Sequence, residues 1–121
     1  MRGDPIVCWE LATHDEAKSA EFFRKVFDWE VTFDEKLGFY RVKSPGTADS
    51  SRGLIFTLRQ AKLPFLTIYI AVRDIEAKCK LVRENGGFIV IEPFDISDGE
   101  RICLFNEPSG VTFAMIQEKS A

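Results

Sequence analysis

Histidine and cysteine, the side chains most often used as metal ligands or nucleophiles, are few in this sequence. The only histidine, His14, stands where a helix is expected to begin, which favours a surface or capping role. The three cysteines, Cys8, Cys79 and Cys103, are an odd number without CxxC spacing, which argues against a disulfide framework. Cys8 has no histidine near it to activate the thiol, so we interpret it as a small core residue.

Glu10 is the acidic residue that could do chemistry, and it lies in an expected strand over residues 6–12. Alternation puts Glu10 and Cys8 on one face of that strand and the larger apolar side chains on the other. A Glu10 whose pKa burial raised toward neutrality would work as a general base. The alternative is structural: Glu10 pairs with Arg59 or Arg101, because a buried charge needs a partner.

The elements that must position these residues are clearest over residues 67–91, TIYIAVRDIEAKCKLVRENGGFIVI. A β-rich run over residues 68–72 predicts a strand. Asp74 can cap the helix that follows, which has Ile75, Cys79 and Val82 on its apolar face. Two glycines after Asn85 end the helix, and residues 88–91 predict a second strand.

The first half of the chain has the same kind of pattern. After the strand over residues 6–12, Asp15 is the expected N-cap of a helix, with Thr13 and Glu16 as an alternative capping box. Further strands are expected at residues 29–33, 39–42 and 54–59, and in the second half at 101–105 and 111–117. The Pro-, Gly- and Ser-rich stretch Ser44 to Arg52 predicts a loop that could cover a site.

The two halves form an internal repeat. An offset of 59 residues takes Ala12, Asp15, Ala20, Trp29 and Val31 to Ala71, Asp74, Cys79, Phe88 and Val90. An offset of 57 takes Gly53 and Phe56 to Gly110 and Phe113. Each half is therefore βαβββ, and about 60 residues are too few to bury such a sheet alone. We predict one α+β domain over residues 1–121, with modules at 1–60 and 61–121. The modules should form a curved, mostly antiparallel eight-stranded sheet around a concave cleft, with helices outside.

Composition excludes several classes of protein. The net charge is −3 and the pI about 5.2, and basic residues do not cluster, so no nucleic-acid surface is expected. No apolar run reaches the roughly 18 residues needed to span a bilayer, and the first residues do not form a signal peptide. These features predict a soluble, cytoplasmic protein.

The sequence resembles the vicinal oxygen chelate superfamily, which contains glyoxalases, bleomycin-resistance proteins and extradiol dioxygenases. The resemblance runs through nearly the whole chain. It rests on Trp9-Glu10-Leu11 with Phe27-Asp28-Trp29, on residues 69–77 (YIAVRDIEA) with Gly86-Gly87, and on residues 106–114 (NEPSGVTFA). The last of these is similar to a closing DPxGxxFxL pattern, with Glu107 in place of Asp.

The resemblance also implies where metal ligands would lie. In metal-dependent members, His or Glu ligands come from the first and last strands of each module, which here correspond to Cys8, Thr57, Thr67 and Ala114. None of the four is His, Asp or Glu, whereas a divalent metal needs two or three such donors. We therefore expect no metal and no other cofactor.

The remaining polar residues suggest a binding cleft. Glu10 and Tyr69 occupy equivalent positions two residues beyond the ligand-like ones, and Arg59 should share the face of Thr57. We expect a ligand-binding floor that also includes Cys8, Thr67 and Ala114, with Glu10 as the best catalytic candidate. Three functions stay open: a metal-free binder of a small, partly hydrophobic molecule; a lyase, isomerase or dioxygenase; and a non-catalytic oligomerisation or partner-binding module. The resemblance also implies a homodimer.

Overall fold

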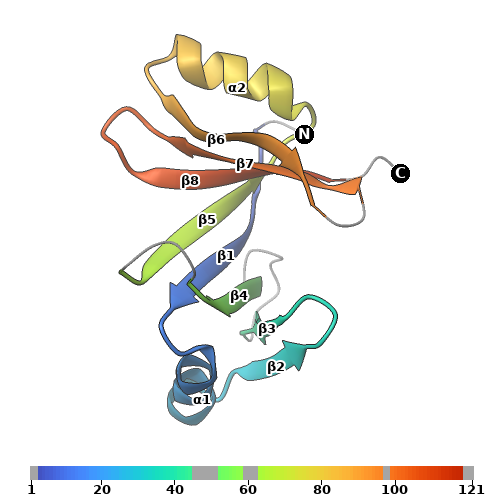
Figure 1. Ribbon diagram of the computed structural model, residues 1–121, viewed down its shortest axis with the longest axis vertical. Coiled ribbons are helices and arrows are strands. Elements are labelled where there is room, and N and C mark those ends of the chain that lie inside the picture. The colour runs from blue at the N-terminus through green and yellow to red at the C-terminus, as the bar shows by residue number, and fades with distance from the viewer. Residues whose placement is uncertain (1–2, 45–51, 59–62, 97–98, 119–121) are drawn as a thin grey trace. The chain divides into compact units, whose positions relative to one another are not determined.

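Two βαβββ units make up the chain in the computed structural model, which describes residues 3–44, 52–58, 63–96 and 99–118 (Figure 1). The first unit is Val7–Thr67, and the second combines Met1–Ile6 with Ile68–Ala121. In the described ranges the chain has eight strands and two helices, with mixed pairing that is mostly antiparallel. The predicted α+β class and the tandem βαβββ order are confirmed.

The first unit has its strands in the order β2-β3-β4-β1, with helix α1 (Glu16–Phe27) packed on one face. Its strands are β1 (Ile6–Thr13), β2 (Glu30–Asp34), β3 (Phe39–Lys43) and β4 (Arg52–Thr57). β1 and β4 run parallel and the other pairs antiparallel. The core between helix and sheet contains Ala20, Val31, Val42 and Ile55, with Trp9, Leu11, Phe23, Trp29 and Tyr40 packed around it.

Asp15 caps α1, which settles the two capping alternatives. Its side chain accepts a hydrogen bond from the Lys18 N–H at 3.1 Å, while the Thr13 hydroxyl lies 3.0 Å from that of Ser19. At the other end Asp28 takes the left-handed conformation, φ 56°. Its N–H donates to the Arg24 carbonyl at 3.0 Å, and the Trp29 N–H donates to the Phe23 carbonyl at 3.4 Å.

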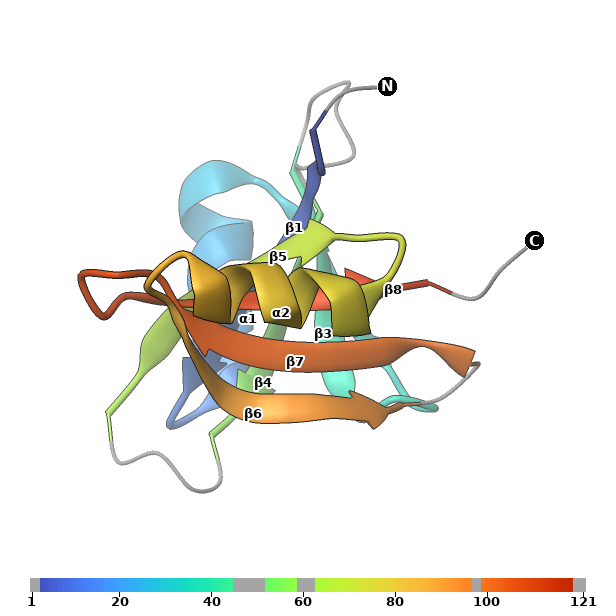
Figure 2. The same ribbon diagram turned by 90° about the horizontal axis from the view of Figure 1, so that it is seen from above.

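The second unit repeats this plan with the strand order β5-β8-β7-β6 and helix α2 (Ile75–Glu84) over one face (Figure 2). Its strands are β5 (Phe65–Ala71), β6 (Phe88–Asp95), β7 (Arg101–Asn106) and β8 (Thr112–Gln117). β5 pairs with β8 in parallel, and β8-β7-β6 is antiparallel. The core contains Val72, Ile75, Cys79, Ile89, Cys103 and Met115.

The ends of α2 follow the predicted signals. Asp74 accepts a hydrogen bond from the Ala77 N–H at 3.1 Å, and Gly86 has a positive φ of 89° after the last turn. Gly87 must lack a side chain, because a Cβ there would lie 2.9 Å from the carbonyl oxygen of Asn106 and 2.6 Å from Val82.

Several element bounds differ from the prediction. β6 continues to Asp95 through two register shifts, and β5 begins three residues before Ile68. The predicted loop Ser44 to Arg52 lies mostly outside the described residues, as does Arg59. Neither α1 nor α2, the helices of the described ranges, has the length and apolar character needed to cross a membrane.

Candidate binding faces of the two units

The face of the first sheet that turns away from α1 carries a concentration of charge. Trp9 and Leu11 pack toward α1, so alternation along β1 turns Cys8 and Glu10 to the opposite side. Glu10 is half-buried, and its neighbour across the parallel pair is Leu54 of β4. We call this side the helix-free face of the first unit.

Three cations share that helix-free face. Tyr40 and Val42 of β3 pack into the core beside α1, which turns Arg41 and Lys43 to the other side. Arg52 of β4, the register neighbour of Lys43, follows the same alternation. Arg41 is bound to Asp34, whose carboxylate lies 2.8 Å from it, and this hydrogen bond lowers the pKa of Asp34. Strand alternation was visible in the sequence, but the prediction did not include Arg41, Lys43 and Arg52 on the same face as Glu10.

The helix-free face of the second unit is apolar instead. Ile70 and Met115 pack with the core under α2, so their neighbours Tyr69 and Ala114, which pair across β5 and β8, turn to the other side. Tyr69 is 7% exposed and Ala114 is fully buried. The same alternation adds residues from β6, β7 and β8, namely Ile91, Phe94, Ile102, Leu104 and Ile116. Thr67, two residues before Tyr69 on β5, is also buried.

Strand register revises one of the ligand-like positions. Glu10 pairs with Leu54 in the first unit, and its repeat equivalent Tyr69 pairs with Ala114 in the second. Leu54 is therefore the structural equivalent of Ala114, an offset of 60 residues, and the predicted equivalence of Thr57 and Ala114 is wrong. Leu54 directly follows Gly53, whereas Ala114 comes four residues after Gly110. Matching the two glycines therefore gave the wrong equivalence for Ala114.

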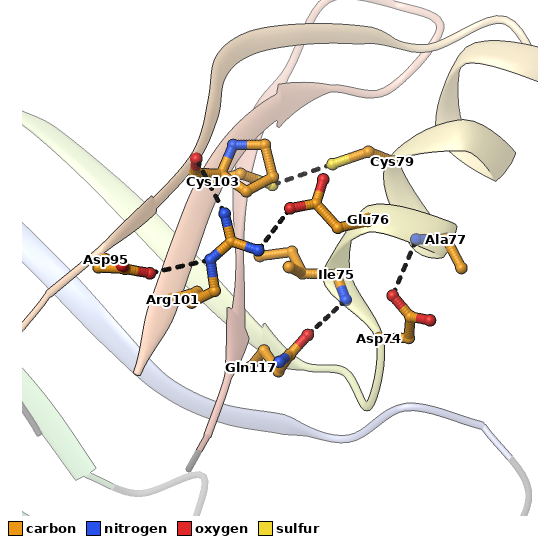
Figure 3. Close-up of polar contacts among 10 residues, drawn as sticks. Asp74, Ile75, Glu76, Ala77, Cys79, Asp95, Arg101, Cys103 and Gln117 are labelled. Atoms are coloured by element: carbon orange, nitrogen blue, oxygen red, sulfur yellow. Dashed lines mark hydrogen bonds and ion pairs between the residues drawn. The ribbon is translucent and has the colours of Figure 1, made fainter. Parts of the chain in front are cut away.

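Thr57 points to α1 and not to the helix-free face. Its hydroxyl donates a 2.7 Å hydrogen bond to Glu16 Oε2 in the first turn of α1. The second unit has a counterpart, in which the Ile75 N–H donates to Gln117 Oε1 at 2.7 Å (Figure 3). Thr57 and Gln117 therefore both anchor the start of a helix to the last strand of its unit.

The positions that the superfamily uses for metal ligands do not fit a divalent ion. With the corrected register they are occupied by Cys8, Leu54, Thr67 and Ala114, which offer one thiol, one hydroxyl and two hydrocarbon side chains. A divalent metal needs several carboxylates or imidazoles. Over the described part of the chain, no three His, Cys, Asp or Glu residues gather into a possible metal cluster.

Arg59 and Arg101 were the two arginines predicted as alternative ion-pair partners of Glu10. Arg59 lies outside the described residues. Arg101 already has two carboxylate partners in its own unit, Glu76 of α2 and Asp95 at 3.0 Å (Figure 3). The hydrogen bond to Glu76 raises the pKa of Arg101 further above its ordinary value. His14 is exposed beside the cap of α1, as its sequence position predicts.

Comparison with known proteins identifies the family. The model of the Glyoxalase/Bleomycin resistance protein/Dioxygenase superfamily matches residues 5–115, so the chain belongs to this superfamily. The resemblance seen in the sequence is thereby confirmed.

Individual relatives are more distant. Anthracycline biosynthesis protein DauV of Streptomyces sp. strain C5 is 27% identical over 125 residues, covering 88% of this chain and 44% of that protein. Putative glyoxylase CFP32 of Mycobacterium bovis is 25% identical over 113 residues, covering 89% and 43%. The chain thus spans less than half the length of these curated relatives.

Solved structures support the fold. A Streptomyces coelicolor methylmalonyl-CoA epimerase variant in complex with 2-nitronate-propionyl-CoA aligns with a TM-score of 0.64 at 20% identity, covering 95% of this chain and 97% of the other. The hypothetical protein BH1468 of Bacillus halodurans aligns with a TM-score of 0.73 at 14% identity, covering 99% and 98%. At these identities the likeness extends to the fold alone.

Proposed function

We propose that this chain binds a small, partly apolar organic molecule on its helix-free sheet faces, without a metal at the superfamily's usual positions. One observation carries the proposal: around Tyr69, the second unit's helix-free face is formed mostly by hydrocarbon side chains, and one of them, Ala114, stands where metal-dependent relatives need a ligand. Small-molecule sites are typically apolar surfaces with a few polar groups that orient the ligand.

Each helix-free face supplies its own orienting group in this proposal. On β5, Tyr69 presents a phenol, which can donate or accept a hydrogen bond, and Thr67 is the predicted contact beside it. On β1, Glu10 presents a carboxylate, which accepts, and Cys8 is the predicted contact beside it. Two matched relatives are named as anthracycline biosynthesis proteins, so polycyclic aromatic compounds are the first probes to test. We also propose that the chain is a homodimer, and light scattering on the titrated samples measures its mass.

Titration of two variants tests the binding proposal. Glu10→Gln keeps the shape and removes the charge, and it should weaken binding by about 1–3 kcal/mol if the carboxylate holds the ligand. Tyr69→Phe should weaken it by about 0.5–1.5 kcal/mol, the scale for a neutral hydrogen bond. Glu21→Gln is the matched control, because the Glu21 side chain is exposed on α1 and pairs with Arg24 of the same helix at 3.1 Å. Its affinity should equal that of the wild type.

A denaturation midpoint measured on each variant separates binding from stability. If Glu10 only satisfies a structural partner, Glu10→Gln lowers the midpoint while the affinity of the folded fraction stays constant. Affinity that is unchanged in both Glu10→Gln and Tyr69→Phe would contradict the proposed site. Elemental analysis that found one transition metal ion per chain would contradict the metal-free part of the proposal.

A further inference from the structure

Two thiols face each other in the core of the second unit, away from the helix-free face. Cys79 lies on α2 and Cys103 on β7, and their Sγ atoms are 3.7 Å apart (Figure 3). Both side chains are buried, with 2% and 0% exposure, among the apolar residues of this core. The proposed binding function uses neither of them.

Contacts on both sides of the pair hold α2 over the sheet. At the start of the helix the Ile75 N–H is bound to Gln117, and Glu76 is paired with Arg101 of β7 (Figure 3). Toward its end, Arg83 is paired with Glu92 of β6. These contacts bracket Cys79 along the helix, so its thiol is kept opposite that of Cys103.

We propose that Cys79 and Cys103 are a modification site, at which exchange with a small-molecule disulfide such as oxidised glutathione forms a reversible bond between α2 and β7. One protein thiolate attacks a sulfur of the small disulfide and releases one glutathione thiol. The second protein thiolate then attacks the mixed disulfide and releases the other. The protein loses two protons and two electrons, and the glutathione disulfide is reduced to two thiols.

Geometry makes the second step favourable and burial makes the first step slow. A disulfide has an S–S distance of about 2.05 Å, so the sulfurs must approach by roughly 1.7 Å once the first has reacted. The attacking species is a thiolate. Burial raises the pKa of the Cys79 thiol, and burial also raises the pKa of the Cys103 thiol, to about 12. Exchange therefore waits for α2 to open locally, and the bond should then hold the reclosed helix in place.

The experiment uses the full chain with Cys8→Ser, so that only the buried pair can react. The protein is incubated with oxidised glutathione, with and without denaturant well below the unfolding midpoint. We expect a mass loss of two hydrogen atoms with no glutathione adduct, and a peptide pair linked through Cys79 and Cys103. The reaction should be faster in the mild denaturant. The oxidised protein should have a higher denaturation midpoint, and a reducing agent should restore the original one.

Three results would overturn the proposal. Both thiols could remain reduced even in the mild denaturant, or each could carry a separate glutathione, which would show that they do not meet. Oxidation could also leave the midpoint unchanged or lower it. Cys79→Ser and Cys103→Ser, each added to Cys8→Ser, are controls that should retain a single thiol and form no internal link. The wild-type pair alone decides the outcome if either control fails to fold.

Discussion

Replacing Gly53 with alanine tests how the first unit positions the strand that carries Glu10. Gly53 of β4 lies directly beside Trp9 of β1, and a Cβ added there would lie 2.1 Å from Trp9 Cε2 and 2.3 Å from Cζ2. The indole also has Phe23 and Trp29 packed beside it, with ring centroids 6.4 and 6.2 Å away. Trp9 therefore has little space into which it can move.

The magnitude follows from this overlap. Carbon atoms in contact are about 3.5–4.0 Å apart, so the new methyl group requires a shift of roughly 1.5 Å between β4 and the indole. Overpacking of this kind costs about 1–3 kcal/mol. Alanine recovers about 0.4–1 kcal/mol by restricting the unfolded chain, because Gly53 does not need a positive φ. From the middle of each range, we expect a net loss of about 1.3 kcal/mol in the free energy of unfolding.

Chemical denaturation of four proteins measures this loss. The set is the wild type, Gly53→Ala, Trp9→Phe and the double variant. Phenylalanine is a smaller ring that lacks Cζ2 and the outer part of the indole, so Gly53→Ala should cost less in the Trp9→Phe background than alone. Gly53→Ala with wild-type stability, or with the same cost in both backgrounds, would refute the packing explanation. The Gly53→Ala variant should also bind ligand more weakly if the shift of β1 displaces Glu10.

Two further predictions concern hydrogen bonds. Thr57→Val should lower the free energy of unfolding by about 1–3 kcal/mol, because it removes the hydrogen-bond partner of part-buried Glu16. Ligand affinity should stay constant. Reduced affinity in the folded protein would show that Thr57 contacts the ligand. Hydrogen bonds from the Ser109 side chain and from the Ser109 and Val111 N–H groups lower the pKa of Glu107. Its folded pKa is thus below its unfolded value, so its contribution to stability is present above the unfolded pKa and is lost as the pH falls through the folded one. NMR titration should place Glu107 below the ordinary value of about 4.3, and Glu107→Gln should flatten the acid side of the stability profile; a titration at the ordinary value would contradict this.

The elements of the fold could be predicted because their signals are local. Asp15 and Asp74 cap their helices, and Gly86 ends α2 with a positive φ. Alternation also placed Trp9 of β1 on the face opposite to Glu10, and Trp9 packs against the core under α1. Each of these features depends on a few neighbouring residues, and the internal repeat showed them twice.

The partners of each strand could not be predicted in the same way. The offset of 57 residues that matched Gly53 with Gly110 made Thr57 equivalent to Ala114, whereas the strand pairs make Leu54 equivalent. Gly53 lies against Trp9 in the first unit, whereas Gly110 has a positive φ of 100° in the turn before β8. The two glycines therefore have different roles. A shift in register by an odd number of residues reverses the face of a side chain, which is why Thr57 lies against α1.

The superfamily, the tandem βαβββ order and the capped helices could be predicted from the amino-acid sequence, which also led us to expect no acidic or imidazole ligands at the superfamily's metal positions. These depend on residue type and local spacing, which the chain states directly. The three-dimensional fold was needed to show that Leu54 pairs with Glu10, that Thr57 and Gln117 anchor helices, and that Cys79 faces Cys103 across 3.7 Å. The physical reason is that hydrogen bonding between strands and packing between helix and sheet join residues far apart in the chain, and their register depends on the whole core.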